Sequence, residues 1–317
     1  MSKEKVVVAL GGNALQEKGL PPTAESQLEV VKKTAEFVAE ISCKGHELAI
    51  VHGNGPQVGR ILLSSETAAQ ANKDTPAMPF DVCGSMSQGY IGYHIQQALR
   101  ESLRKRDRNV PVVSLVTQVV VDENDPAFQN PTKPIGAFYS EEEAKKMQAE
   151  KGYTVKEDAG RGWRRVVPSP MPKRIVEIDA VKELWDSTIV VTCGGGGIPV
   201  KENSDGSLEG VAAVIDKDLA AEELAEEVGA DILMILTEVD KVAINFNKPD
   251  QKNLSQLSVA EAEKYMEEGH FAPGSMLPKV KAAVKFARAN PGKKAIITSL
   301  YKAVDALGGN EGTVITM

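Results

Sequence analysis

Three glycine-rich turns, each directly behind a short apolar run, constrain this chain more than any other feature. They lie in the segments VVVALGGNAL (6–15), LAIVHGNGPQVG (48–59) and IVVTCGGGGIPV (189–200). Runs this short and this uniformly apolar are typical of central strands in a parallel sheet, which places the turns at the carboxyl ends of the strands. Glycine there leaves backbone N–H groups open to a small anion. We therefore expect the three turns to share one anion site.

The rest of the chain alternates helix-like and strand-like segments. Helical spacing of apolar residues predicts a helix between Thr23, as its cap, and Gly45, and further helices at 56–70, 81–106, 218–228, 258–268 and 278–290. Apolar runs predict strands at 47–51, 110–121, 211–215, 231–236, 242–246, 294–298 and 312–316. Strands that alternate with helices from end to end indicate a mostly parallel sheet covered on both faces.

Residues 122–173 have a different character. They contain prolines at 126, 131, 134, 168, 170 and 172, together with the charged helix-like run EEEAKKMQAEKG. The segment is too long for a simple loop and too short for a usual independent domain. We interpret it as a protruding lid subdomain inserted into the main fold.

Charge and composition exclude several classes of partner. The net charge is −7 and the isoelectric point is near 5.4, whereas binding to a phosphate backbone requires a basic field. No stretch approaches the ~20 apolar residues of a membrane span, and MSKEK leads into the first strand without an apolar signal core. Cys43, Cys83 and Cys193 form no CxxC pair. We expect a cytoplasmic protein without nucleic-acid or membrane partners.

The familiar nucleotide and hydrolase motifs are missing from the sequence. The glycines of GNGPQVG are spaced one residue too widely for a GxGxxG fingerprint, and there is no GxxxxGK[ST], GxSxG or HExxH. The histidines, at 46, 52, 94 and 270, lie far apart along the chain. A dinucleotide fold, a P-loop, a hydrolase and a metal site therefore have little support.

Polar residues next to the glycine turns supply further candidates. Asn13 and Asn54 each follow a glycine, where an amide either caps a helix or donates to a ligand. Four consecutive glycines at 194–197 cost more backbone entropy than a simple turn requires. Lys217 lies between two aspartates at a predicted helix start, and such carboxylates can hold an ammonium group toward a reacting phosphoryl group.

Seven segments, in order along almost the whole chain, resemble one family. They are LGGNAL (10–15), HGNGPQVG (52–59), CGSMSQGY (83–90), PTKPIG (131–136), CGGGGIPV (193–200), IDKDLAA (215–221) and GSMLPKVKAA (274–283). Together they resemble carbamate kinase, of the amino acid kinase superfamily. The resemblance implies a three-layer αβα sandwich around a mostly parallel eight-stranded sheet, with the protruding lid, in a protein that is usually a homodimer.

The resemblance also implies the organisation and the reaction. Residues 1–317 would be a single amino acid kinase domain, with a carbamate- and phosphoryl-binding lobe (1–212), the lid at about 122–173 and a nucleotide-binding lobe (213–317). ATP with Mg²⁺ would donate its γ-phosphoryl group to carbamate, reversibly giving ADP and carbamoyl phosphate. The reaction could run toward ATP in arginine catabolism or toward carbamoyl phosphate for biosynthesis.

Roles follow from the resemblance, position by position. The catalytic residues would be Lys133, Lys217, Asp218 and Lys279. Contacts to carbamate and to the transferring phosphoryl group would come from Gly11, Gly12, Asn13, Gly53, Asn54, Ser85, Gly194, Gly195, Gly196 and Gly197. The nucleotide would lie near Lys217, Thr237, Val242, Gly274, Met276, Leu277 and Lys279. No residue is assigned as a direct ligand of Mg²⁺.

One position separates the alternatives within this superfamily. Acylamino-acid kinases carry a lysine two residues before the first glycine pair, where this chain has Ala9. In carbamate kinases the lid lysine, here Lys133, supplies that charge. The competing interpretations are an acylamino-acid or UMP kinase of the same fold, and a non-catalytic anion- or nucleotide-binding module. The IDKD segment and the lysines favour catalysis.

Overall fold

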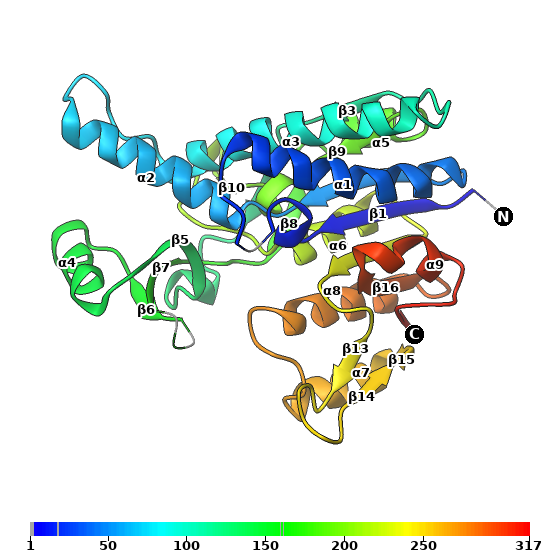
Figure 1. The fold of residues 1–317 in the computed structure, drawn as a ribbon. Helices are drawn as coiled ribbons and strands as arrows, with labels where there is room; N and C mark the ends of the chain where they lie inside the picture. Colours follow the sequence, from blue (N-terminus) through cyan, green and yellow to red (C-terminus); the bar gives the residue numbers. More distant parts are fainter. Residues whose placement is uncertain (1–2, 18, 159, 161) are drawn as a thin grey trace.

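A computed structural model describes residues 3–17, 19–158, 160 and 162–317, and a central sheet runs through it (Figure 1). Within these residues the sheet has eight strands, in the order β15-β17-β16-β12-β1-β2-β9-β3. All neighbours are parallel except β16 and β17. The prediction of a mostly parallel eight-stranded sheet is confirmed. The bounds are β1 (Lys5–Leu10), β2 (Glu47–His52), β3 (Val112–Ser114), β9 (Ile189–Val191), β12 (Ile232–Thr237), β15 (Gln256–Ser258), β16 (Lys294–Ser299) and β17 (Thr313–Thr316).

Helices cover both faces of this sheet and give the predicted three layers. Val6, Val8 and Leu10 of β1 point to one face, whereas Val7 and Ala9 point to the other, because successive strand side chains alternate. The first face packs against α1 (Ala24–Cys43), α3 (Phe80–Arg104) and α9 (Ala303–Leu307). The second packs against α5 (Ile178–Trp185), α6 (Lys217–Glu227), α7 (Val259–Glu267) and α8 (Met276–Ala289).

The ends of the first long helix follow its sequence signals. The Thr23 hydroxyl accepts a hydrogen bond from the Ser26 N–H, which caps α1. Gly45 follows the helix with φ +99°, a conformation that glycine adopts without strain. The helices predicted at 56–70 and 81–106 are α2 (Gly55–Ala71) and α3.

The inserted segment folds around a small sheet of its own, separate from the central one. Its strands, in the order β5-β7-β6, are β5 (Lys133–Tyr139), β7 (Trp163–Val167) and β6 (Val155–Glu157). The predicted charged helix is α4 (Glu141–Lys151), which begins with a capping box between Ser140 and Glu143. Figure 1 shows this lid, in green, projecting from the body beside α2.

Two predicted strands are wrong. Residues 110–121 form β3 and then β4 (Gln118–Val121), which lie in different sheets. The predicted strand divides at Thr117, which the Gln88 side chain of α3 contacts: the Thr117 N–H donates to Gln88 Oε1 (2.9 Å), and the Thr117 carbonyl accepts from Gln88 Nε2 (3.1 Å) and from the Ile198 N–H (2.8 Å). Residues 211–215 are not a strand either, since Val211 and Val214 donate to the carbonyls of two separate prolines, Pro199 and Pro168.

The remaining elements complete the described structure. β4 belongs to a second sheet in the order β11-β10-β4-β8, with β8 (Pro172–Ile175), β10 (Ile198–Glu202) and β11 (Leu208–Gly210). β13 (Val242–Ile244) pairs with β14 (Lys252–Leu254). Short 3₁₀ turns are η1 (Gly12–Ala14), η2 (Pro126–Phe128), η3 (Gly194–Gly196) and η4 (Leu300–Lys302). Among the described residues, no helix has the length and apolarity needed to cross a bilayer.

A buried carboxylate joins α6 to α8. Glu222 of α6 is fully buried, and its Oε2 lies 2.6 Å from Lys285 Nζ of α8. Burial raises the pKa of Glu222 to about 8. The folded protein therefore keeps a proton that the unfolded chain releases near its ordinary pKa of 4.5. This proton stabilises the fold fully below about pH 4.5, and the contribution is lost as the pH rises toward about 8.

Glu222→Gln tests this pH dependence, because glutamine keeps the size but cannot ionise. We expect the thermal unfolding midpoint of the wild type to fall between about pH 5 and about pH 8, and that of Glu222→Gln to fall less. Calorimetry across this range measures the two slopes. The exposed Glu183→Gln on α5 is the matched control and should follow the wild type. Equal slopes for Glu222→Gln and the wild type would contradict this account.

Candidate active site

The three glycine turns meet at one edge of the central sheet. β1, β2 and β9 are neighbours, so the turns that follow them lie side by side. The Gly53 N–H donates to the Leu10 carbonyl (3.1 Å), which joins the second turn to the end of β1. A Cβ on Gly195 would lie 2.1 Å from Asn54 Nδ2, so the second and third turns are in contact. The structure brings the turns together as expected; that they bind a common anion stays a prediction.

The third turn is packed so tightly that side chains do not fit. Gly195, Gly196 and Gly197 have φ values of +71°, +98° and +86°. A Cβ on Gly196 would lie 2.3 Å from the Ile215 carbonyl oxygen. The N–H groups of Gly196 and Gly197 donate within the turn, to the carbonyls of Cys193 and Gly194. The amides of Gly194 and Gly195 therefore remain as the candidates for holding a substrate.

Helix α3 braces these turns through residues that the sequence analysis did not single out. Asn54 Nδ2 donates to Ser87 Oγ (2.8 Å), and Gln88 Nε2 donates to the Gly194 carbonyl (2.9 Å). Ser85, the predicted contact in the same motif, donates its hydroxyl to the Val82 carbonyl of its own helix (2.7 Å). The motif CGSMSQGY thus marked the right segment. Helical periodicity places Ser87, two residues on, away from the face of Ser85, whereas Gln88, three residues on, lies near that face.

His52 also belongs to the site, although the sequence analysis considered it only as a metal ligand or hydrolase residue. Its ring is buried behind the third turn, where a Cβ on Gly194 would lie 2.4 Å from His52 Nε2. Burial lowers the pKa of His52 to about 4. The imidazole is therefore neutral near pH 7, and it supports the turn by packing without adding charge.

Lysines from three distant segments converge on two aspartates. Lys133 Nζ of the lid strand β5 lies 2.6 Å from Asp216 Oδ2. Lys217, the first residue of α6, and Lys279, in the first turn of α8, both donate to Asp218, with Lys279 Nζ 2.7 Å from Oδ2. The structure therefore gathers all the predicted catalytic side chains into one ionic cluster.

Asp216 connects the lid lysine to the start of α6. One of its oxygens, Oδ1, accepts the Asp218 N–H (2.9 Å) and caps the helix, while Oδ2 contacts Lys133. The sequence indicated Asp216 only as a carboxylate that flanks Lys217. The cluster also adjoins the glycine turns, since a Cβ on Gly53 would lie 3.5 Å from Lys217 Cδ.

The cluster has an excess of positive charge for an anion. Burial by itself would raise the pKa of Asp218, but Lys217 and Lys279 outweigh it and hold that pKa far below its usual range. Burial, aided by repulsion from Lys279, lowers the pKa of Lys217 against the attraction of Asp218. With three ammonium groups and two carboxylates, these side chains are net positive. The amino termini of α6 and α8 add positive dipole ends.

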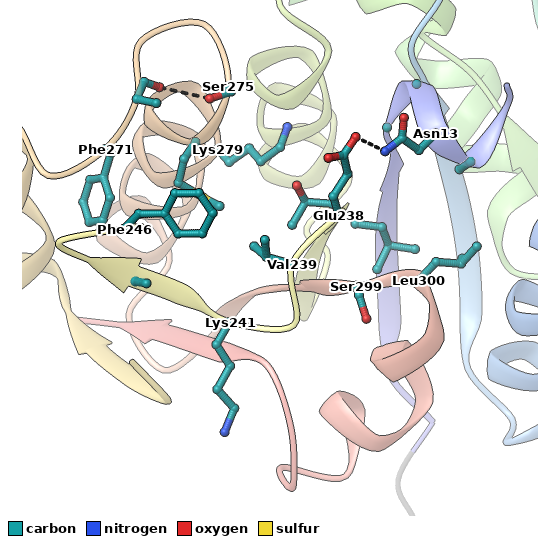
Figure 2. A pocket seen from close by; sticks show the side chains of 18 of the residues that line it. Asn13, Glu238, Val239, Lys241, Phe246, Phe271, Ser275, Lys279, Ser299 and Leu300 are labelled. Carbon is teal, nitrogen blue, oxygen red and sulfur yellow. Dashed lines mark hydrogen bonds between the residues drawn. The ribbon is translucent and has the colours of Figure 1, made fainter. Parts of the chain in front are cut away.

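A cavity of about 1090 Å³ lies beside the cluster, large enough for a nucleotide. Of the predicted site residues, its lining contains Gly11, Gly12, Asn13, Thr237, Met276 and Lys279. Figure 2 shows the aromatic side chains of Phe246 and Phe271 in this cavity, and Asn13, which donates a hydrogen bond to Glu238.

Four predicted nucleotide residues, Lys217, Val242, Gly274 and Leu277, are described but do not belong to this lining. Val242 is fully buried in the core, and its N–H donates to Thr313 Oγ1 (2.8 Å). Its neighbours Lys241 and Ala243 face the cavity instead, as expected when side chains alternate along β13.

No dedicated metal cage is formed by the part of the chain that the structure describes, where no group of three or more His, Cys, Asp or Glu side chains could hold an ion. Asp216 and Asp218 are engaged by lysines. Mg²⁺ in phosphoryl-transfer sites is held largely by phosphate oxygens and water. The donor set therefore fits an Mg²⁺ ion that arrives on the nucleotide phosphates.

Comparison with known proteins agrees with this geometry. The family model described as "Amino acid kinase family" matches residues 4–299. The chain belongs to the amino acid kinase family. Within this family it is similar to the carbamate kinases: it is 59% identical to that of Clostridium perfringens over 98% of this chain and 99% of the relative, and 57% identical to that of Pyrococcus horikoshii over 99% of both. The structure of Giardia lamblia carbamate kinase bound to AMP-PNP superposes with a TM-score of 0.91, at 46% identity and 99% coverage of both chains.

The contribution of the Asp218 carboxylate, which Lys217 and Lys279 share, can be measured as a change in the free energy of unfolding. In Asp218→Asn the ammonium groups of Lys217 and Lys279, whose side chains are only partly exposed, lose their shared carboxylate. We expect a loss of about 3 kcal/mol in the free energy of unfolding near pH 7. The deficit should shrink as the pH rises, because Lys217, whose pKa burial already lowers, then deprotonates in the folded state. Denaturant titrations between about pH 7 and pH 10 measure this difference.

Asp179→Asn is the matched control for this titration, because Asp179 lies in the first turn of α5 but is exposed. We expect its free energy of unfolding to stay within about 0.5 kcal/mol of the wild type. A deficit in Asp218→Asn that does not depend on pH would argue against coupling between this carboxylate and the two lysines.

Proposed function

We propose that this chain is a carbamate kinase that transfers the γ-phosphoryl group of ATP to carbamate and, in reverse, makes ATP from ADP and carbamoyl phosphate. The observation that carries the proposal is the position of Lys133: the lid brings it to the Lys217–Asp218–Lys279 cluster beside a nucleotide-sized cavity. The similarity to carbamate kinases over nearly the whole chain supports the same activity.

The reaction requires cations because both reactants are negative. An anionic carbamate oxygen attacks a phosphoryl group that carries its own charge, and two unit charges 4 Å apart repel by ~4 kcal/mol at an effective dielectric constant near 20. Lys133, Lys217 and Lys279 offset this repulsion from three sides. Phosphoryl transfer needs alignment and charge stabilisation, so no nucleophilic side chain is required. We expect direct in-line transfer without a phosphoenzyme.

Each substrate has a place in this arrangement. The nucleotide occupies the cavity near Thr237 and Met276, with Phe246 and Phe271 as apolar surface for the base and the phosphates toward Lys217 and Lys279. Carbamate and the transferred phosphoryl group lie at the glycine turns, against the amides of 11–12, 53 and 194–195 and the Asn54 side chain. Mg²⁺ held by the nucleotide phosphates would neutralise charge on their oxygens.

The lid contributes charge and excludes water. Lys133 is about one-third exposed and belongs to the inserted subdomain, so its ammonium group is at the site only when the lid is docked. A docked lid also protects the labile carbamoyl phosphate from hydrolysis. The position that holds a lysine in acylamino-acid kinases is here Ala9, which is fully buried in β1. Lys133 therefore takes over that charge, which favours carbamate over an acylamino acid as the acceptor.

We also propose that the protein acts as a cytoplasmic homodimer. β3 is the last strand of the central sheet at one side. Large apolar side chains are exposed near β3. Val116, two residues after this strand, is 57% exposed, and Tyr93 (57%) and Met86 (48%) lie on α3, which packs beside it. Such side chains gathered near a sheet edge favour a contact with a second copy.

The acceptor can be identified by running the reaction toward ATP. The purified chain is mixed with ADP, Mg²⁺ and one phosphoryl donor: carbamoyl phosphate, acetyl phosphate or N-acetylglutamyl phosphate. We expect ATP to form selectively from carbamoyl phosphate. Faster ATP formation from another donor would assign a different acceptor. Binding of ADP without turnover of any donor would indicate a non-catalytic module.

Lys133→Ala tests the role of the lid lysine. Removing one preorganised charge from a phosphoryl-transfer site lowers kcat by about 100-fold or more, and we expect the KM for ADP to change by less than about threefold, because Lys133 lies outside the cavity lining. Steady-state kinetics with carbamoyl phosphate measure both parameters. Lys145→Ala, on the exposed side of α4, is the control. Turnover close to that of the wild type would remove Lys133 from the mechanism.

A further inference from the structure

The lid is docked on α2 by a contact that leaves no room for side chains. A Cβ added to Gly59 of α2 would lie 2.3 Å from the Cα of Gly136 in β5. Beside this contact, Ile135 and Val167 of the lid are buried against Val58, Leu62 and Phe80 of the body. Gly136 is three residues from Lys133, so the position of β5 on α2 determines where the Lys133 ammonium group can lie.

Glu66, at the far end of α2, holds the lid by charge. Its carboxylate is only 14% exposed and accepts hydrogen bonds from Lys151 Nζ (2.5 Å) and from the Tyr153 hydroxyl. Arg165 Nη1 lies 3.5 Å from Glu66 Oε1, and its guanidinium group stacks on the Tyr153 ring at 3.6 Å from the centroid. Lys151, Tyr153 and Arg165 all belong to the lid, whereas Glu66 belongs to the body.

The contact with Glu66 is coupled to Lys133 through two paired strands. In the antiparallel ladder of β5 and β7, Arg165 faces Ile135, and Val167 faces Lys133. On β7, Arg165 is therefore two residues from Val167, which pairs with Lys133. A short stretch of sheet runs from the Glu66 contact to the Lys133–Asp216 contact, and Figure 1 shows this sheet beside α2.

The protonation state of Glu66 suits a permanent ionic contact. Burial by itself would raise the pKa of Glu66, but the hydrogen bonds from Lys151 and Tyr153 and the charge of Arg165 outweigh it and lower that pKa. Burial and the hydrogen bond to Glu66 raise the pKa of Tyr153 to about 12, so the phenol keeps its proton and remains a donor. Around pH 7 the carboxylate is charged, and its partners all donate to it or attract it.

We propose that Glu66 is a positioning residue for phosphoryl transfer, which fixes the lid on α2 and so holds the Lys133 ammonium group at Asp216. This inference rests on the catalytic role proposed above for Lys133. Glu66 belongs neither to the cavity lining nor to the ionic cluster, so it acts through the lid.

Glu66→Gln keeps the size of the side chain and removes its charge. Lys151 and Arg165 then lose the anion between them, and the docked lid becomes less stable relative to an undocked one. Because hydrogen bonds to a charged group are among the stronger ones in proteins, we expect kcat to fall about 10- to 100-fold. The KM for ADP should change by less than about threefold, because the cavity is untouched.

A double-mutant cycle separates this role from a general effect on the fold. Kinetics are measured for Glu66→Gln, Lys133→Ala and the double variant, with Glu142→Gln on the exposed side of α4 as the matched control. If Glu66 acts through Lys133, the double variant is no slower than Lys133→Ala alone. Hydrogen exchange in β5 and β7 should also become faster in Glu66→Gln and not in Glu142→Gln.

The outcomes distinguish this inference from the proposed role of Lys133. Wild-type kcat in Glu66→Gln with a slow Lys133→Ala would overturn the positioning role alone. The same holds if the two losses multiply in the double variant, since Glu66 would then act independently of Lys133. Wild-type kcat in Lys133→Ala would overturn the catalytic role of Lys133 and this inference with it. Should Glu66→Gln fail to fold, Tyr153→Phe carries the test, because it removes one donor to Glu66 and keeps the ring on Arg165; an unchanged kcat there would count against the proposal.

Discussion

The structure depends on keeping like charges together at the edge of a buried sheet. Lys133, Lys217 and Lys279 come from the lid, from α6 and from α8, and they would repel one another without Asp216 and Asp218 between them. Asp216 and Asp218, which flank Lys217 at the start of α6, supply both carboxylates. The amino terminus of α6 therefore sets the geometry of the whole cluster, and the buried Glu222–Lys285 contact further along the same helix pair holds α6 against α8.

The glycine turns bring backbone amides close together at the sheet edge, as the proposed substrate site requires. Their amides are useful only if the turns approach one another, and this approach excludes side chains: Gly195 faces Asn54, Gly196 faces the Ile215 carbonyl, and Gly194 faces His52. Ile215 precedes Asp216 directly, so the third turn also fixes the segment that leads into the ionic cluster. Backbone packing and ionic pairing are thus coupled within a few residues.

The alternation of strand-like and helix-like segments predicted the covered parallel sheet and the main helices, because it depends on local periodicity. The resemblance to carbamate kinases predicted which lysines come together. Features that depend on a contact with a residue distant in the sequence were not predicted. The strand predicted at 110–121 is divided at Thr117, whose N–H donates to the Gln88 side chain of α3 and whose carbonyl accepts from Gln88 and from Ile198 of β10. Val242 lies in the core, whereas its neighbours Lys241 and Ala243 face the cavity, because the strand that begins there alternates its side chains. The motif around Ser85 was informative, yet the residues that brace the turns are Ser87 and Gln88.

One of the three cations of the cluster, Lys133, lies on the lid and not on the central sheet. A lysine at position 9 would stand permanently in the sheet, whereas this chain has a fully buried alanine there and its third ammonium group on β5. Under the proposed mechanism, the same docking event then delivers the charge and removes the water that would hydrolyse carbamoyl phosphate. Because Lys133 belongs to the lid and not to a strand of the central sheet, contacts between the lid and the body must fix the position of its ammonium group. The Gly59–Gly136 approach and the Glu66 carboxylate do this with backbone packing and with charge, the two means that also build the site itself.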